Sequence, residues 1–264
     1  MRWKWKARLD KLDKKIIISI PAGQALVVQQ VPQDSDAGEF EYHIGENTRC
    51  TITGYGSKIT FYCAQNSDLT YCMIIASDPS INSGRTGEGV LQSSYTHDIK
   101  VVLQGARARA RIRGLYLMCN QKKLMIRSRQ EHQAPDTQSD LVLKGVLAGQ
   151  SQVTYEGMVY IAPGARRSRA NQQNKNILLS SRAYARSIPS FEVLTNDVIC
   201  THGSAVGQLD PAQLFYLQAR GLDLRGAKGL LVKGFIADIL DDMPDINCDE
   251  LLSGIVDKIV DKIV

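Results

Sequence analysis

The sequence predicts a mainly β body followed by a C-terminal helical part, and three observations support this. From Ile16 to about Cys200, short extended runs follow one another closely, each bounded by Gly, Asn, Asp or Pro, without comparable helical periodicity. The run Arg107–Arg113 alternates strictly between arginine and a small or apolar residue, which is typical of a strand with one solvent-exposed and one buried face. After Asp210 the apolar residues instead recur at helical spacing.

Composition narrows the class of protein. The chain has 264 residues, 44% hydrophobic and 22% charged, which is a soluble globular composition with room for one large domain. No apolar run approaches the roughly 20 residues that span a bilayer, and the opening residues lack the apolar centre of a signal peptide. We therefore expect a cytoplasmic protein without a membrane-bound part. The six cysteines form no C-x-x-C pair, which argues against a zinc knuckle and a disulfide framework.

The chain divides into a basic N-terminal segment (1–15), a β body (16–207) and a helical part (208–264). In the first segment Arg8–Lys15 has a helix-compatible register, although a frayed terminus is the favoured interpretation. The strands expected in the body are Ile16–Ile20, Ala25–Val31, Thr51–Thr53, Ile59–Cys63, Thr70–Ile75, Ile99–Leu103, Ala108–Tyr116, Leu124–Ile126, Leu141–Leu147, Gln152–Ile161, Ile177–Leu179 and Phe191–Leu194.

Two all-β architectures fit this pattern, a β-sandwich and a parallel β-helix, and strand spacing alone does not choose between them. Two local features favour the β-helix. The Arg107–Arg113 run would direct all its arginines outward and its small residues into a narrow interior where coils stack. Asn171, Asn174 and Asn176 fall in a predicted polar turn region, where stacked amides could satisfy backbone groups of neighbouring coils.

The helical part begins with a clear start signal. Asp210 is a suitable N-cap, and Pro211 suits the first helical position because its missing N–H is not needed there. This first helix should end at Gly221. A second is expected from about Leu224 to Leu240, and a third, strongly two-sided helix from Asp249 onward.

Cys200 and His202 are the candidates for metal or cluster ligation. Their two-residue spacing on a strand places both side chains on one face, and thiolate and imidazole are ligands of iron–sulfur clusters. Two ligands are too few to hold a cluster, so a partner would have to supply the others. In the alternative interpretation Cys200 is a buried structural residue and His202 caps the following turn.

Other functional classes have less support. His132 is expected to be a satisfied turn histidine, and His43 and His97 have no ligand-like neighbours in sequence. The basic clusters after Lys15 are not interleaved with aromatic residues as a single-strand nucleic-acid surface would be, so we expect no nucleic-acid partner. The sequence has no Walker motif, dinucleotide-binding glycine motif or Gly-x-Ser-x-Gly elbow, and we expect no enzymatic activity.

Several motifs together resemble the SufB/SufD family of the Suf iron–sulfur cluster assembly system. They are RGLY from Arg113, KGVL from Lys144, APGA from Ala162, ANQQN from Ala170, NILL from Asn176, DVICTHGSAVGQLD from Asp197 and LFYLQARG from Leu214. They follow the family's order over about residues 98–241. The resemblance implies a right-handed parallel β-helix core followed by a C-terminal helical subdomain. The chain is more similar to SufD than to SufB, because Cys-x-His-Gly stands where SufB is expected to carry Glu-His-Glu.

The resemblance also implies partners. A SufB-like paralogue would pair with the β-helix core to form a heterodimer, and a SufC-like ATPase would bind the C-terminal helices. The candidate SufC-interface residues are Leu214, Phe215, Tyr216, Arg220, Gly221, Leu231 and Phe235. No permanently bound cofactor is expected, only transient iron or a nascent cluster at a partner interface. Relatives usually carry a longer N-terminal helical region, so this chain looks N-terminally short.

Three alternatives remain open at this point. The isolated chain could form a homodimer in place of a heterodimer. It could be a SufB-like scaffold that carries the nascent cluster itself. A polysaccharide-acting parallel β-helix enzyme is disfavoured, because Asp and Glu do not recur at a coil-like interval.

Overall fold

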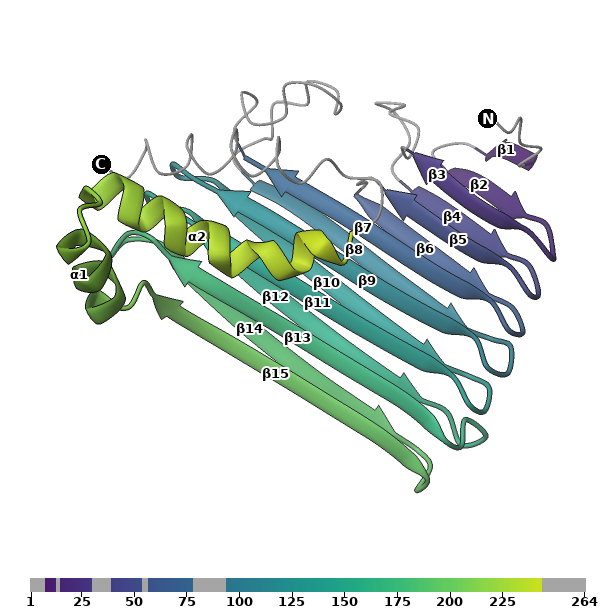
Figure 1. Ribbon diagram of the computed structural model, residues 1–264. Coiled ribbons are helices and arrows are strands. Elements are labelled where there is room, and N and C mark those ends of the chain that lie inside the picture. Colours follow the sequence, from purple (N-terminus) through teal and green to yellow (C-terminus); the bar gives the residue numbers. More distant parts are fainter. Residues whose placement is uncertain (1–7, 13–14, 30–38, 54–56, 78–93, 244–264) are drawn as a thin grey trace.

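In the part of the chain that the structure describes, the fold is a two-sheet parallel β-helix with two helices after it (Figure 1). The computed structural model describes residues 8–12, 15–29, 39–53, 57–77 and 94–243. The expected third helix from Asp249 lies outside these residues. The strands are β1 (Arg8–Leu12), β2 (Lys15–Ile20), β3 (Ala25–Gln29), β4 (Glu39–Ile44), β5 (Arg49–Thr53), β6 (Lys58–Cys63), β7 (Asp68–Ala76), β8 (Ser94–Leu103), β9 (Arg109–Met118), β10 (Lys123–His132), β11 (Gln138–Leu147), β12 (Gln152–Ile161), β13 (Ser168–Leu178), β14 (Tyr184–Val193) and β15 (Val198–Gln208).

The strands alternate between the two sheets, so each coil contributes one strand to each. One sheet has the order β1-β2-β4-β6-β8-β10-β12-β14, and the other β15-β13-β11-β9-β7-β5-β3. All neighbours pair in parallel except β1 and β2, which are antiparallel. The expected parallel β-helix is therefore confirmed. At the N-terminal end, Arg8–Leu12 is a strand and not the helical turn that its register allowed.

The core lies between the sheets, because alternate side chains of the strands from β4 to β13 point inward. In β9, Ala110 and Ile112 are buried in this interior as predicted. Arg109 and Arg111 are exposed on the outer face, but Arg113 is buried there beneath a helix. The prediction that Arg107 belongs to the same strand face is wrong, since Arg107 lies in the preceding turn.

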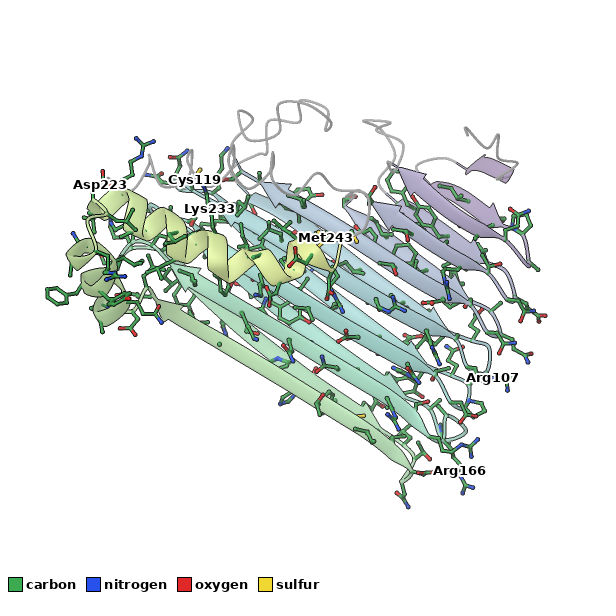
Figure 2. All side chains as sticks on the ribbon, viewed as in Figure 1. Arg107, Cys119, Arg166, Asp223, Lys233 and Met243 are labelled. Carbon is green, nitrogen blue, oxygen red and sulfur yellow. The ribbon has the colours of Figure 1, made fainter. Side chains whose placement is uncertain are left out.

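That turn is one of a stack at one end of the coils. One residue in each turn of this stack has a left-handed backbone, with φ between 54° and 61°: Asn47, Asn66, Arg107, Asp136 and Arg167. The Asn66 N–H donates to the Ala106 carbonyl and the Arg107 N–H to the Pro135 carbonyl, so each turn bonds to the next. Figure 2 shows Arg107 and Arg166 at this end. Left-handed backbone favours Asn, and the stacking of these turns brings Asn66 Nδ2 within 2.9 Å of Asn47 Oδ1.

The predicted asparagine turn is wrong, because Asn171, Asn174 and Asn176 all lie within strand β13. Asn174 and Asn176 point into the interior, where they form a closed set of hydrogen bonds with Tyr116. Tyr116 donates to Asn176 Oδ1 at 2.5 Å, Asn176 Nδ2 donates to Asn174 Oδ1, and Asn174 Nδ2 donates to the Tyr116 hydroxyl. A Cβ at Gly145 would lie 2.1 Å from the Tyr116 ring, so glycine is required beside this set. Two of the recognised motifs, RGLY and KGVL, therefore meet in the core.

Helix α2 (Leu224–Asp241) covers the outer face of the sheet that contains β9 and β11, whereas α1 (Pro211–Ala219) buries no residue. The expected start of α1 is confirmed, since Asp210 Oδ1 accepts the Ala212 N–H at 2.8 Å. The apolar cluster beneath α2 comprises Cys72, Ala76, Leu115, Leu117, Val146, Val232, Ile236, Ile239, Leu240 and Met243. Neither α1 nor α2 has the length and apolar composition of a membrane-spanning helix.

Two buried cations fix α2 to this sheet. Lys144 of β11 donates to the Phe235 carbonyl at 2.5 Å, pairs with Asp238, and lies 4.7 Å from the centroid of the Phe235 ring. Arg113 of β9 bonds to Asp242 at the C-cap of α2, with an Nε to Oδ2 distance of 2.9 Å. The helix therefore docks through charge as well as through apolar packing.

Candidate functional site

The last coil leaves one end of the β-helix open. Strands β14 and β15 are the final members of their sheets and have no further strand beside them among the described residues. The exposed large apolar residues of this coil are Tyr184, Ile188, Val193, Leu194, Ile199 and Val206. Unpaired strand edges with exposed apolar side chains are a template for another chain.

Cys200 and His202 lie on β15, on the face that continues the interior, so their predicted placement on one face agrees with the structure. Cys200 is next to buried Ala170 of β13, and His202 is next to buried Gln172. Because no further coil follows among the described residues, the interior face is here open to solvent, and His202 is exposed while Cys200 is half-buried.

The two side chains have different surroundings. Cys200 packs against an apolar cluster of Val159, Ile161 and Ala165 with Ala170. Burial raises the pKa of the Cys200 thiol, which favours the neutral form over the thiolate. A nearby cation or metal would act in the opposite direction and favour the thiolate.

His202 differs from the other histidines in its hydrogen bonding. Both ring nitrogens of His132 lie 2.8 Å from hydroxyl groups, His97 Nε2 lies 3.4 Å from the Tyr71 hydroxyl, and His43 lies near Glu41. Among the described residues, the ring nitrogens of His202 have no hydrogen-bond partner; its imidazole instead stacks on the ring of Phe191 at 4.6 Å. Both nitrogens are thus available to a ligand from outside.

Ligation by this chain alone would be incomplete. Within the described residues, no three His, Cys, Asp or Glu side chains are grouped closely enough to hold a metal ion. A thiol and an imidazole suit iron or an iron–sulfur cluster, but such a cluster needs four protein ligands as a rule. Further ligands would have to come from a second molecule at the open end.

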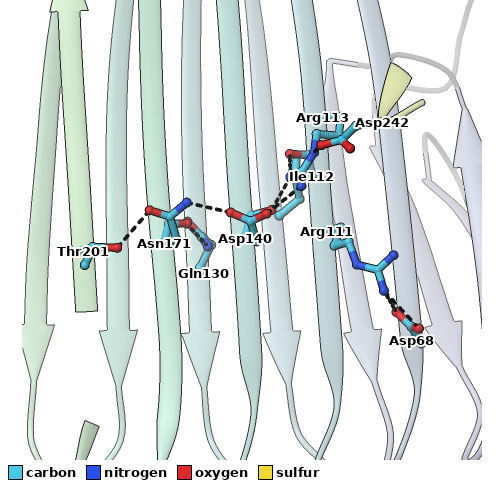
Figure 3. A network of polar contacts seen from close by, with 9 residues as sticks. All are labelled: Asp68, Arg111, Ile112, Arg113, Gln130, Asp140, Asn171, Thr201 and Asp242. Carbon is cyan, nitrogen blue, oxygen red and sulfur yellow. Dashed lines mark hydrogen bonds and ion pairs between the residues drawn. The ribbon is translucent and has the colours of Figure 1, made fainter. Parts of the chain in front are cut away.

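A polar ladder on the outer face connects this strand to α2 (Figure 3). Thr201, between the two candidate ligands, donates to Asn171 Oδ1 at 2.9 Å, and Asn171 Nδ2 donates to Asp140 Oδ1 at 2.7 Å. Arg113 then donates to Asp140 Oδ2 at 2.6 Å and to Asp242. Burial opposes the charge on Arg113, but its bonds to Asp140 and Asp242 outweigh this effect and raise its pKa.

Sequence reasoning missed this ladder. The sequence pattern predicts Arg113 as one of the outward arginines and Asn171 as part of a polar turn, and it predicts no role for Asp140 or Thr201. The available signal was the recurrence of an outward polar residue about once per coil, at Asp140, Asn171 and Thr201. It becomes visible only when the coil register is known.

The residues predicted to contact a SufC-like partner differ in how far they are exposed to solvent. Phe215 and Tyr216 are 74% and 60% exposed on α1, with the Arg220 guanidinium over the Tyr216 ring and Gly221 at a positive φ of 98°. Phe235 instead packs against the sheet beneath α2. Leu214 and Leu231 are partly buried, and Leu230, beside Leu231, is 50% exposed.

Comparison with known proteins gives a consistent result. A SufBD family protein of Mycobacterium leprae is 32% identical over 148 residues, which cover 53% of this chain and 38% of that protein. The iron–sulfur cluster assembly protein SufD of Escherichia coli is 22% identical over 227 residues, 81% of this chain and 53% of that protein. A SufBD family protein of Synechocystis is 30% identical over 155 residues, 58% of this chain and 32% of that protein.

This chain therefore spans about a third to a half of the length of these relatives. The family profile described as "SUF system FeS cluster assembly, SufBD core domain" matches residues 52–235, from the fifth strand through most of α2. The matched region includes the coils from β6 onward, the open end and residues 224–235 of the docked helix, and on this evidence the chain belongs to the SufBD family of the Suf iron–sulfur cluster assembly system.

Proposed function

We propose that this chain is a SufD-like, non-enzymatic scaffold subunit that works in the cytosol with a SufB-like paralogue and a SufC-like ATPase in iron–sulfur cluster assembly. The observation that carries the proposal is the placement of Cys200 and His202 together at the open end of the β-helix. A thiol and an imidazole at an unpaired strand edge could form part of a metal or cluster site whose other ligands come from a partner. Iron or a nascent cluster is the cargo of this site.

The open coil supports pairing with the SufB-like subunit. The free edges of β14 and β15 can accept strands of a related β-helix, and the apolar residues around them would be buried by that contact. Such pairing would place the partner's ligands opposite His202. It would also cover the apolar surface that the last coil exposes to water.

The helices support docking of the SufC-like subunit. Phe215 and Tyr216 offer aromatic surface on α1, and aromatic residues are frequent anchors at protein interfaces. The sequence has no phosphate-binding motif, so ATP would be bound by the partner. Because α2 is tied to β9 and β11 by Arg113 and Lys144, a force applied to the helices would reach the coils.

The SufD-like assignment rests on two observations. Alignment with SufD of E. coli extends over 81% of this chain, and Cys200–Gly203 supplies the Cys-x-His-Gly sequence at the open end. A SufB-like scaffold would instead hold a cluster stably on the isolated chain.

Co-expression with SufB and SufC tests the proposal. The tagged chain should retain both partners, and His202→Ala should leave the complex intact while lowering its iron–sulfur absorbance by about tenfold or more. His43→Ala, which changes an exposed histidine of β4, is the matched control and should have no effect. Failure of SufB and SufC to bind, or unchanged absorbance in His202→Ala, would overturn the proposal. Stable reconstitution on the isolated chain would favour the SufB-like alternative.

A further inference from the structure

The contact between Phe191 and His202 crosses the open end of the β-helix. Phe191 lies on β14 and His202 on β15, which belong to opposite sheets. Their ring centroids are 4.6 Å apart and their planes are inclined by 25°. The two rings are therefore stacked face to face across the last coil.

Phe191 is anchored, whereas His202 is not. In β14 Phe191 pairs with Val159, a fully buried residue of β12, and it packs against the same apolar cluster that contacts Cys200. His202 is exposed on a terminal strand. Without the stack, an exposed side chain of this kind would sample several rotamers and would lose entropy on binding a ligand.

The geometry of stacking suits a metal ligand. The lone pair of an imidazole nitrogen lies in the ring plane, so a neighbour on the ring face leaves both nitrogens accessible. Ligating histidines are usually oriented by a hydrogen bond to their second ring nitrogen. Among the described residues His202 has no such partner, and the Phe191 ring is the contact that orients it.

We propose that Phe191 is a positioning residue for His202: it holds the imidazole plane at the open end so that a ring nitrogen faces a ligand delivered at the partner interface. This inference rests on the proposed function. It assigns to Phe191 the role that a second hydrogen bond has at most metal-binding histidines.

The test compares Phe191→Leu, which removes the ring, with Phe191→Tyr, which keeps it. In NMR spectra of the isolated chain, ring currents should shift the His202 imidazole protons upfield in the wild type and in Phe191→Tyr but not in Phe191→Leu. In the complex with SufB and SufC, Phe191→Leu should lower the iron–sulfur absorbance by roughly tenfold without loss of either partner. Phe191→Tyr should keep the absorbance at the wild-type level. Tyr62→Leu, which removes the ring stacked on His43 at 4.8 Å in coils away from the open end, is the control and should match the wild type in both readouts.

The outcomes separate this inference from the proposed function. If His202→Ala lowers cluster content but Phe191→Leu does not, the positioning role is wrong and the proposed function stands. An unchanged imidazole shift in Phe191→Leu would also overturn the positioning role. If His202→Ala itself has no effect, the proposed function fails. Phe191→Met keeps most of the side-chain volume without a ring and gives the same comparison if the leucine variant does not fold.

Discussion

At the scale of single residues, His132 and His202 show how position in the coils decides the role of an imidazole. His132 ends β10 inside the helix, where Nδ1 lies 2.8 Å from Thr137 Oγ1 and Nε2 lies 2.8 Å from Ser139 Oγ. Burial lowers its pKa to about 4, so it is neutral at pH 7. His202 occupies an interior-facing position in the last described coil, where it is exposed.

His132 makes stability depend on pH. The unfolded histidine has an ordinary pKa of about 6.5, whereas the folded one has a pKa of about 4. Below pH 6.5 the unfolded chain therefore binds a proton that the folded chain does not, and stability present above pH 6.5 is lost as the pH falls towards 4. We expect a loss of about 2 kcal/mol between pH 7 and pH 5 from this group, measured by urea unfolding. His132→Gln should flatten this dependence and His43→Ala should not; equal losses in wild type and His132→Gln would contradict the assignment.

At the scale of elements, α2 is held by charges that its sheet buries. The Lys144 side chain is only 5% exposed, while its partner Asp238 is 71% exposed. Replacing Asp238 would leave a buried cation without its carboxylate, which is more costly than the loss of a surface ion pair. Asp242 has the same relation to Arg113, whose side chain is 8% exposed.

Asp238→Ala should therefore loosen α2. We expect a loss of about 1–3 kcal/mol in unfolding free energy and faster hydrogen exchange in Leu224–Asp241, with the inner strands unchanged. Asp241→Ala is the matched control, because Asp241 is an exposed aspartate of the same helix. Its expected effect is within about 0.5 kcal/mol. Similar exchange in both variants would show that apolar packing alone holds α2.

The sequence pattern located strands where their inward positions are apolar. Gln152–Ile161 was predicted with the bounds that β12 has, because Val153, Tyr155, Val159 and Ile161 alternate with outward residues. In β13 only the last residues were predicted, because Gln172, Asn174 and Asn176 occupy interior positions. The Gln172 Nε2 group donates to the Tyr155 hydroxyl, and Asn174 and Asn176 bond to the Tyr116 hydroxyl of an earlier coil. That compensation is long-range and invisible in a local window.

At the scale of the whole molecule, the candidate site was only partly predictable. The two-residue spacing was sufficient to place Cys200 and His202 on one face. It could not show that β15 is the last strand of its sheet or that Phe191 lies across from His202, because both depend on how all preceding coils stack. The exposure of the histidine thus results from the end of the solenoid rather than from its own sequence neighbourhood.

The open end should control association with a SufB-like partner. Val206 on β15 faces the uncovered interior and is 45% exposed, so a partner coil would bury it. Val206→Lys would place a charge in that contact and should weaken association by at least about tenfold, equivalent to 1.4 kcal/mol. The free chain should stay folded, because the new side chain meets water there.

Leu230→Lys, at a 50% exposed position of α2, is the control and should retain the partner in pull-downs. If Val206→Lys recovers as much partner as the wild type, the paired surface lies elsewhere, since a lysine cannot be buried unpaired at a tightly packed edge without loss of affinity.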